Sequence, residues 1–510
     1  MSDTPVRILP DAAVSRAFDD YTWQNFHQTV RQRCRRIDVY NPSGPASLGK
    51  YAMTTREIQR LIGEAQTAGQ PLRALGSGWS FTDIAATPGH HLNTANLNFI
   101  IQPGTRSVSS AYGGDLAALL FVQCGVSISE LNKYLEAPSR GRSLKTTGAA
   151  NGQTVGGALG TGTHGSALSE GGFQRHVVSM HLIVGADRHV ILEPETRPVA
   201  SDWFANQIGA AIVRNDQWFN AALVSLGSFG VLHGVFIETR ERFLLEANGT
   251  ALPYDVALKR AINTADIGGL PVPNADEPPY FLEFTINPFD LGNVVATAMH
   301  ARSCPASHVP NYAVDGELRP GLDTLGIVGM ITDQFPDLTP ILLGAAVGKL
   351  VSFGTYKGTW GEIFDYISHE HYACSASIGV NVEDATKVID AILALQATIR
   401  APALMSVRYV RPTGALLEMS RFPLTCAIGI DGAVSDRTMD LYEKVWTELD
   451  RLGIRYTHHW GKFARFSPTR VKKLYGAANV RHWQDARLAL LGAAGTKTFS
   501  NPLTDRAGLS

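Results

Sequence analysis

Helical and extended patterns alternate along the first part of the chain. In TTREIQRLIGEA (residues 54–65), apolar positions recur at helical spacing after Thr54 and Glu57, which are separated as in a capping box. These positions are Ile58, Leu61, Ile62 and Ala65. The next run, PLRALGSGWSF (residues 71–81), is typical of a strand that ends in a tight turn. We therefore predict a helix that begins near Thr54 and is followed by a strand.

The same order of elements recurs further along. The apolar run AALLFVQCGV predicts a strand, and Ser127 and Glu130 after it have the spacing of a second capping box. HVVSMHLIV and HVIL flank the turn GADR, which predicts a hairpin with Asp187 in its turn. VLHGVFIETR (residues 231–240) predicts one more strand.

The pattern changes after about residue 243. Glycine clusters become sparse, and alternating strands such as YFLEFTI and LMSVRYV mix with helices such as DATKVIDAILAL. At 510 residues the chain exceeds what one hydrophobic core usually supports. We predict a first domain over residues 1–243, an inserted α+β domain over 244–455, and a return to the first domain over 456–510.

Composition narrows the functional class. Apolar residues make up 45% of the chain and charged residues 18%, which is ordinary for a soluble globular enzyme. Lys and Arg total 45 against 46 Asp and Glu, so no strong positive field favours nucleic acid or an acidic membrane surface. We expect neither of these partners.

The cysteines and the N-terminal segment suggest a compartment. The five cysteines are widely spaced and form no CxxC, so neither a disulfide framework nor a zinc site is indicated, and we expect no metal. The N-terminus has no apolar run of the kind found in signal peptides, so the expected location is cytoplasmic. LTPILLGAAVGKLVSF, from Leu338, is shorter than a membrane span and contains Lys349, so we expect a core or lid helix there.

Three glycine-rich loops in the first domain follow predicted strands: GSGWS (residues 76–80), TVGGALGTGTHGS (154–166) and SLGSFGVL (225–232). Backbone N–H groups in such turns can converge on phosphate oxygens, so a pyrophosphate is a plausible ligand. Gly160, Gly162 and Gly165 have G-x-G-x-x-G spacing, but no strand of branched residues precedes them and no helix pattern follows. A Rossmann nucleotide site is therefore not indicated.

The order of these segments resembles a known family. RALGSGWSFTD, CGVSISEL, GQTVGGALGTGTHGS and LGSFGVL look like the signatures of the vanillyl-alcohol-oxidase or PCMH-type FAD-binding flavoproteins. HHWGKF (residues 458–463) resembles the HWxK motif of their aldonolactone and alditol oxidase branch, and WQNF near Trp23 resembles its N-terminal segment. The resemblance implies an α+β fold, in which a two-lobed PCMH-type FAD-binding domain carries an inserted α+β substrate (cap) domain.

The resemblance also implies the cofactor. GSGWS would wrap the FAD pyrophosphate, TVGGALGTGTHGS would pass the ribityl chain and the flavin, and a backbone group would meet the adenine side. The residues so assigned are Gly76, Ser77, Gly78, Trp79, Ser80, Thr154, Gly157, Thr161, Gly162, His164, Gly165, Ser166 and Val231. Many members of this branch have a histidine, covalently linked to the flavin, where this chain has Trp79. We therefore expect FAD to be bound non-covalently.

The candidate catalytic residues lie in the inserted domain and the C-terminal motif. A cation near the reduced flavin is favourable, and Lys462 closes the HWxK motif. Relatives place a Glu-x-Arg pair on a strand over the flavin, and the matching residues here are Ser406 and Arg408, so the glutamate is missing. Glu283, on YFLEFTI, is a candidate replacement. His458 and His459 lie beside Lys462, with His459 the candidate for catalysis, and for each of the two histidines a packing role is an equal alternative.

These residues lead to one expected function and two alternatives. We expect an FAD-dependent oxidase or dehydrogenase that oxidises a CH–OH group of an alcohol, polyol or sugar-lactone-like substrate and passes electrons to O2 or another acceptor. The first alternative is a flavoenzyme of the same fold that dehydrogenates or cyclises a larger apolar substrate. The second is a flavin-binding protein without catalysis, in which Ser406 marks a site that has lost its function.

Overall fold

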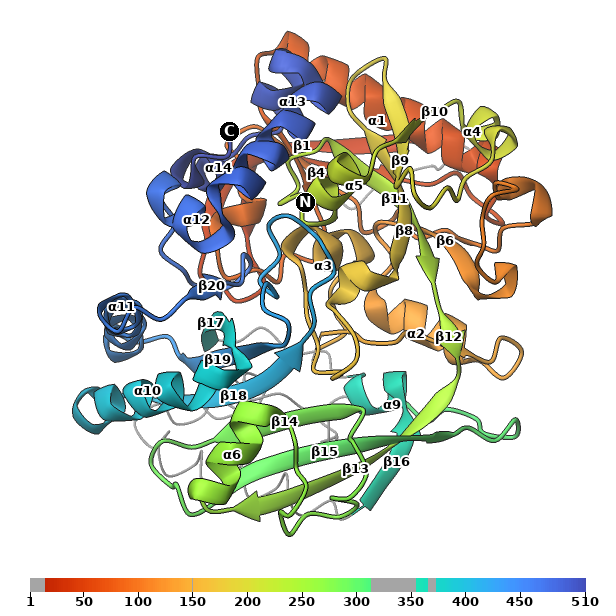
Figure 1. Cartoon of the computed structure of the whole chain (residues 1–510). Helices are drawn as coiled ribbons and strands as arrows, with labels where there is room; N and C mark the ends of the chain where they lie inside the picture. The colour runs from red at the N-terminus through yellow and green to blue at the C-terminus, as the bar shows by residue number, and fades with distance from the viewer. Residues whose placement is uncertain (1–13, 149, 313–354, 366–372) are drawn as a thin grey trace, which may run out of the picture.

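The computed structural model describes residues 14–148, 150–312, 355–365 and 373–510. Within these ranges helices and strands are mixed in two lobes, which lie one above the other in Figure 1. The α+β class expected from the sequence is confirmed. The apolar segment that begins at Leu338 lies outside the described residues, so the expected helix there stays a prediction.

The upper lobe is built on two sheets. The first has the strand order β1-β2-β4-β3, with β1 (Val14–Gln24), β2 (Arg31–Tyr40), β4 (His90–Asn93) and β3 (Leu72–Leu75). The second has the order β10-β9-β8-β11-β6-β5, with β10 (Ala211–Arg214), β9 (His189–Glu193), β8 (Val177–Ile183), β11 (Val231–Glu238), β6 (Leu119–Gln123) and β5 (Ile100–Ile101). β8 and β9 pair antiparallel, so the predicted hairpin is confirmed.

Five helices of this lobe connect and cover the strands. They are α1 (Leu48–Thr67), α2 (Ile128–Glu136), α3 (Val155–Thr161), α4 (Asp202–Ile208) and α5 (Asp216–Leu223). The Ser127–Glu130 capping box of α2 forms as predicted. The predicted start of α1 at Thr54 is wrong, because the helix begins two turns earlier, where the Ser47 side chain caps it. Tyr51 and Thr55 are buried on the same helix face as the predicted apolar positions, and this longer contact stabilises the extra turns.

The lower lobe contains one eight-stranded sheet of order β16-β13-β15-β14-β18-β19-β17-β20. Its strands are β16 (Thr355–Thr359), β13 (Phe243–Leu252), β15 (Val294–Ser303), β14 (Phe281–Ile286), β18 (Ala403–Val410), β19 (Thr425–Ala433), β17 (Ala373–Asn381) and β20 (Tyr456–His458). Its helices are α6 (Val256–Thr264), α9 (Trp360–Phe364), α10 (Ala385–Ile399) and α11 (Asp436–Arg451). β20 pairs with β17, so the strand that starts at the predicted boundary, residue 456, belongs to this sheet.

The two faces of this sheet differ in chemistry. On one face, Val407 of β18 lies between Phe284 of β14 and Ile428 of β19, and these side chains join the core formed with α6, α10 and α11. On the other face, Ser406 and Arg408 of β18 alternate with them along the strand. This second face is polar and is turned toward the upper lobe, where Arg408 lines a cavity.

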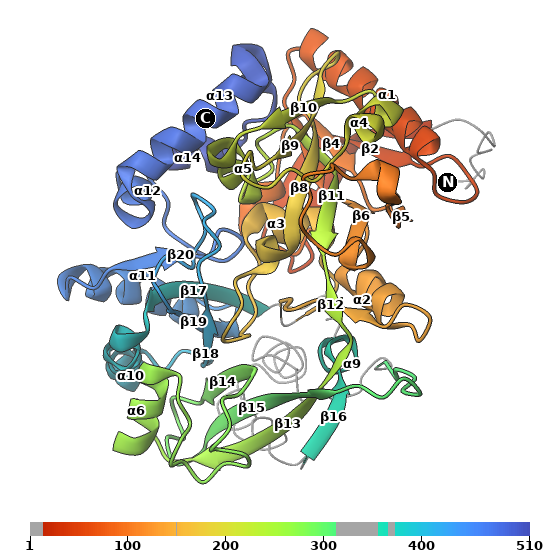
Figure 2. The same ribbon diagram turned by 45° about the vertical axis from the view of Figure 1, so that its right-hand side comes forward.

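The chain passes between the lobes twice. β11 runs through β12 (Arg240–Glu241), which pairs with β7 (Arg142–Ser143), into β13, and this path is clear in Figure 2. After β20 the chain returns to the upper lobe as α12 (Pro468–Tyr475), α13 (Ala477–Thr498) and α14 (Pro502–Ala507). These helices lie beside N-terminal segments in Figure 1. α13 spans 22 residues but is broken by a kink at Gly492, where φ is 65°. None of the described helices is both long and apolar enough to cross a membrane.

Two buried arginines hold the loops of the upper lobe, and one of them, Arg487, comes from the returning helices. Arg73 on β3 donates hydrogen bonds to the carbonyls of Ile84 (2.9 Å) and Gly227 (2.9 Å). Arg487 on α13 donates to the carbonyl of Ser228 (2.9 Å), one residue further along the same loop. Each guanidinium therefore satisfies carbonyls that would otherwise be buried without a donor.

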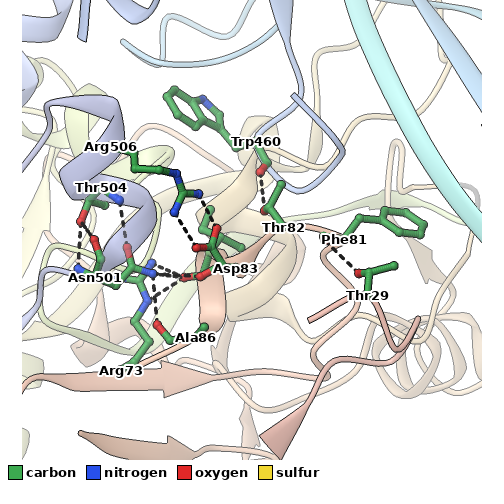
Figure 3. A network of polar contacts seen from close by, with 11 residues as sticks. Thr29, Arg73, Phe81, Thr82, Asp83, Ala86, Trp460, Asn501, Thr504 and Arg506 are labelled. Carbon is green, nitrogen blue, oxygen red and sulfur yellow. Dashed lines mark hydrogen bonds and ion pairs between the residues drawn. The ribbon is translucent and has the colours of Figure 1, made fainter. Parts of the chain in front are cut away.

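Figure 3 shows a second set of hydrogen bonds, which joins α14 to the segment around residue 83. The Asn501 amide donates to the carbonyl of Ile84 (2.9 Å), and Arg506 makes two hydrogen bonds to Asp83 (2.8 and 2.7 Å). The Thr82 hydroxyl next to them donates to the carbonyl of Trp460 (3.0 Å). The segment after GSGWS is thus held by residues from the last part of the chain.

A buried network of histidines joins α1 to the second sheet. The Tyr51 hydroxyl lies 2.7 Å from His181 Nδ1, and the Thr55 hydroxyl lies 3.1 Å from His233 Nδ1. The other ring nitrogen of His233 receives a hydrogen bond from Gln123 (3.0 Å). Burial lowers the pKa of His233 to about 3 and that of His181 well below its usual value. Both rings are therefore neutral in the folded protein at neutral pH.

We predict that acid destabilises the protein partly through His233. In the unfolded chain this ring binds a proton near pH 6.5, whereas in the fold it stays neutral down to about pH 3. Its contribution to stability is therefore complete above pH 6.5 and is lost as the pH falls, by up to about 1.4 kcal/mol per pH unit. Urea unfolding of the wild type and His233→Gln from pH 7 to pH 5 should show a smaller slope, by about one proton, for the variant. Equal slopes would contradict this.

Candidate functional site

A cavity lies where the glycine loops of the upper lobe meet the polar face of the lower sheet. Most of the residues that the sequence assigns to FAD line it. They are Gly76, Ser77, Gly78, Trp79, Ser80, Thr154, Gly157, Thr161 and His164. Arg408, His459 and Lys462 line the cavity from the other side, and residues 225–227 of the third glycine loop also contribute. The structure thus brings together segments that are far apart in sequence.

Four other residues assigned to FAD do not line this cavity. Gly162 ends α3 in the left-handed conformation, and Gly165 packs against the backbone and side chains of residues 146–147. The Ser166 hydroxyl donates to the carbonyl of Leu282 and accepts from the N–H of Tyr409 (2.9 Å), so it joins the loop to β14 and β18. Val231 is buried at the start of β11. In this structure these residues shape the loops from outside the cavity wall.

The close approach of the first two loops requires glycine at position 76. A Cβ atom on Gly76 would lie 2.3 Å from Thr154 Oγ1 and 3.7 Å from Gly157 Cα, so a side chain there would push the loops apart. Thr154 is also the residue that caps α3, by accepting from the N–H of Gly157 (3.2 Å). One side of the cavity therefore depends on the close packing of the Gly76 backbone against the Thr154 side chain.

Trp79 fills the position where relatives carry a flavin-linked histidine. Its ring stacks on Phe26, with centroids 4.6 Å apart and planes inclined by 18°. On its other side a Cβ on Gly152 would lie 2.3 Å from the ring, so glycine is needed there. The indole is held firmly at the cavity wall and has no nucleophilic atom for a bond to flavin.

The G-x-G-x-x-G spacing lies in a context unlike that of a Rossmann site. Gly160 is in the last turn of α3, and Gly162 is its C-cap at φ 69°. The helix therefore precedes the pattern, whereas in a dinucleotide fold the helix follows it. The interpretation from sequence, that the spacing is coincidental, agrees with this geometry.

Glu283 and Arg408 form an ion pair across two neighbouring strands. The two residues are opposite each other in the β14–β18 register, and Arg408 Nη2 lies 3.0 Å from Glu283 Oε1. Their side chains are 11% and 7% exposed, respectively. Ser406 is on the same strand and face as Arg408, but it is buried and does not line the cavity. A carboxylate is therefore present beside the arginine, although it comes from another strand than in the Glu-x-Arg pattern.

Lys462 is paired with a carboxylate that the sequence analysis missed. Its Nζ lies 3.6 Å from Asp431 Oδ1 on β19, and Asp431 also accepts hydrogen bonds from the hydroxyls of Ser375 and Ser406. Asp431 is at an alternating position of the strand TCAIGIDGA, where a charged residue between apolar ones was the available signal. The strand pairing that brings it to Lys462 could not be read from that pattern.

Two histidines that line the cavity, His164 and His459, are neutral at pH 7 for the same reason. Burial, reinforced by the charge of Arg408, lowers the pKa of His164 to about 3, and burial with the nearby His164 and Lys462 lowers that of His459 well below its usual value. His459 Nδ1 accepts from the N–H of Gly461 (3.1 Å), so its proton lies on Nε2. His458, in contrast, is packed among aromatic rings and is absent from the cavity wall.

The cavity fits an anionic dinucleotide such as FAD. Its charged wall residues within the described part of the chain are Arg73, Arg408 and Lys462, and no Asp or Glu lines it. Glu283 and Asp431 stand behind the two cations of the lower lobe. Close glycine loops on one side and cations on the other are what a pyrophosphate and a reducible ring require.

Comparison with known proteins agrees with this cofactor. A family model described as "FAD binding domain" matches residues 50–191. D-arabinono-1,4-lactone oxidase of Debaryomyces hansenii is 27% identical over 249 residues, which cover 47% of this chain and 39% of that protein. L-gulono-1,4-lactone dehydrogenase of Mycobacterium tuberculosis is 23% identical over 413 residues, covering 80% of this chain and 84% of that protein.

Solved structures show the same architecture over the whole length. Cholesterol oxidase from B. sterolicum superimposes with a TM-score of 0.69 at 14% identity, covering 99% of both chains. At this identity the match establishes the fold. The matches to the D-arabinono-1,4-lactone oxidases of Debaryomyces hansenii and Eremothecium gossypii cover only 39% and 33% of those proteins. The fold and the FAD-binding domain predicted from the glycine loops are confirmed.

We predict that Gly76→Ala abolishes tight FAD binding while the protein still folds. The new methyl group would collide with Thr154 and open the contact between the two loops. A loss of at least tenfold in FAD affinity is expected, since about 1.4 kcal/mol already corresponds to that factor. Flavin titration of the apoprotein measures it, with the melting temperature as a check on folding.

Gly49→Ala is the matched control for this substitution. Gly49 lies in the first turn of α1, and a Cβ there would meet nothing within 4 Å. The control should bind FAD like the wild type and be at least as stable. Equal FAD binding by both variants would contradict the proposed role of the Gly76 contact.

Proposed function

Because this chain belongs to the PCMH-type FAD-binding flavoproteins, we propose that it is an FAD-dependent oxidoreductase that oxidises a CH–OH group of a small polyhydroxylated substrate. A polyol or a sugar lactone is the substrate class that the site supports best. The lactone oxidases and dehydrogenase that match this chain, by their names, act on substrates of that class. Electrons would pass to O2 or to another acceptor.

The observation that carries this proposal is the Glu283–Arg408 pair at the cavity. Oxidation of a CH–OH group removes a hydride from carbon and a proton from oxygen, so the site needs a proton acceptor held near the substrate oxygen. A serine hydroxyl at position 406 cannot serve, whereas a carboxylate held by a guanidinium can. Glu283 also keeps 11% of its side chain exposed, in contrast to the 2% of Asp431.

Each residue near the cavity has a separate role in the proposed reaction. Bound FAD supplies the acceptor for the hydride. Arg408 holds the substrate oxygen and fixes the Glu283 carboxylate, which takes the hydroxyl proton. Lys462 and the Nε2–H of neutral His459 donate hydrogen bonds to further hydroxyl groups of the substrate. Trp79 and the glycine loops hold the cofactor and exclude water from its side of the cavity.

The polar face of the lower sheet favours a polar substrate over a large apolar one. The side chains of this face near the cavity are short and hydroxylated or charged. They are Thr285, Ser375, Ser377, Ser406, Glu283, Arg408 and Asp431. A large apolar substrate would offer no hydrogen-bond acceptor to Arg408, His459 and Lys462, which line the cavity from this side. The retained ion pair also argues against a flavin carrier that has lost its chemistry.

The experiment that tests the proposal is anaerobic reduction of the bound flavin by a panel of alcohols. Sugar lactones and alditols should bleach the visible absorption of the flavin, and apolar alcohols should not. Reduction by apolar alcohols alone would favour the alternative of a tailoring enzyme. A flavin that no donor reduces would support the non-catalytic alternative.

We predict that Glu283→Gln lowers kcat/KM by a factor of about 10² to 10⁴, the usual contribution of a general base. FAD binding should be unchanged, because Glu283 pairs with Arg408 on the lower sheet, whereas the glycine loops assigned to the cofactor belong to the upper lobe. Glu246→Gln is the matched control, since Glu246 pairs with Arg302 (3.0 Å) on the same sheet. Comparable kinetic losses in the two variants would rule out a special role for Glu283.

We also predict that FAD is bound without a covalent bond. Acid precipitation should release the yellow colour into the supernatant, because Trp79 offers no nucleophile where relatives have a linked histidine. Colour that stays in the pellet would show a covalent link at another residue. The cytoplasmic location and the identity of the electron acceptor stay predictions from the sequence.

A further inference from the structure

Asp431 is a buried carboxylate for which the proposed reaction has no use. It is 1% exposed and lies on the polar face of β19, opposite Ser375 in the neighbouring strand. The Asp431 side chain is 2% exposed, against 11% for Glu283, and its oxygens already accept two hydroxyl donors, so it stands behind Lys462 and not at the substrate. Burying a charge is costly unless it is compensated, so the presence of Asp431 at this buried position needs an explanation.

The surroundings of Asp431 supply it with two hydroxyl donors and a cation. Oδ1 accepts from the Ser375 hydroxyl and lies 3.6 Å from Lys462 Nζ, and Oδ2 accepts from the Ser406 hydroxyl at 3.3 Å. A Cβ on Gly429 would lie 2.4 Å from Ser406 Oγ and 3.3 Å from Asp431 Oδ2. The strand therefore needs glycine at that position to leave room for this arrangement.

Among the residues that the structure describes, two cations from the lower lobe line the cavity, and each has a carboxylate behind it. Arg408 is paired with Glu283 at 3.0 Å, and Lys462 is paired with Asp431 at 3.6 Å. The third cation, Arg73, is engaged by carbonyls of the upper lobe. Since His164 and His459 are neutral, the charges at the end of the cavity that faces the lower sheet cancel.

We propose that Asp431 is a specificity-determining residue, which balances Lys462 so that the site accepts uncharged polyols or lactones and discriminates against sugar acids. This inference rests on the proposed function, because it concerns the same cavity. Without Asp431 the site would carry a net positive charge, and an anionic carboxylate would be attracted to it. The carboxylate thus acts through Lys462 and is a positioning residue with respect to the reaction itself.

Asp431→Asn tests the proposal, because it removes the charge and keeps the shape. Sulfite is the first probe: it is a small anion that adds reversibly to oxidised flavin and bleaches its visible absorption, so its binding needs no substrate turnover. We expect Asp431→Asn to bind sulfite about tenfold more tightly, in line with one charge acting through a partly buried site. Lys462→Met should bind it about tenfold more weakly, and the double variant should return to the wild-type value.

Ser375→Ala is the control for packing, since it removes a hydrogen bond to Asp431 without changing the charge. Its sulfite affinity should stay within about threefold of the wild type. A disturbed fold would weaken binding in every variant, so the opposite signs of the two single variants distinguish charge from structure. Unchanged or weaker sulfite binding by Asp431→Asn overturns the proposal. Should that variant not fold, a double variant that fails to recover the affinity lost in Lys462→Met overturns it equally.

Gluconate and sorbitol, which share a carbon skeleton and differ in charge, extend the test to the substrate. The ratio of gluconate to sorbitol affinity, from perturbation of the flavin spectrum, should rise about tenfold in Asp431→Asn. An unchanged ratio with tighter sulfite binding would overturn the assignment of specificity. A wild-type flavin that no polyol or lactone reduces would instead overturn the proposed function, while the sulfite result would still decide the charge balance.

Discussion

The pairing register of the lower sheet is the constraint on which the site depends. β14 and β18 place Glu283 opposite Arg408, and β18 and β19 place Ser406 within reach of Asp431. A slip of one residue in either pair would turn these charges onto the face that packs against α6, α10 and α11. The apolar alternate positions therefore fix the register, and the register in turn assembles the polar face. The hydrophobic core and the chemistry of the cavity are specified by the same strands.

The upper lobe shapes its side of the cavity by close packing at glycine residues. Its side of the cavity depends on glycine backbone that side chains approach closely, Gly76 at the Thr154 hydroxyl and Gly152 at the Trp79 ring. These contacts bring few charges of their own to the wall. The lower lobe, by contrast, brings two cations whose carboxylates stand behind them. The division suits a cofactor recognised by shape and hydrogen bonding on one side and a substrate recognised by polar side chains on the other.

The parts of this arrangement that could be predicted from sequence are those with local signals. The Ser127–Glu130 capping box, the β8–β9 hairpin and the glycine loops are encoded within short segments, and they led to the FAD-binding fold. The start of α1 after its cap Ser47 was not predicted, because its first turns are stabilised by tertiary packing of residues such as Tyr51. The role of Asp431 was not predicted either, because its partners lie on β17, on β18 and beyond β20, far from it in sequence. Glu283 was found only as a candidate, since burial depends on which face of the strand the rest of the chain covers.

The hydrogen bonds from the returning helices to the upper lobe affect the order in which this lobe can fold during synthesis. Arg487 and Asn501 supply hydrogen bonds to carbonyls of residues 228 and 84, which leave the ribosome far earlier. At roughly 5 to 20 residues per second, translation of the intervening chain takes on the order of ten seconds or more. During that time the glycine loops lack the contacts that hold them in place. The loops are therefore complete only after α13 and α14 have been made, and a nascent chain stalled before α13 would expose an incomplete nucleotide-binding lobe.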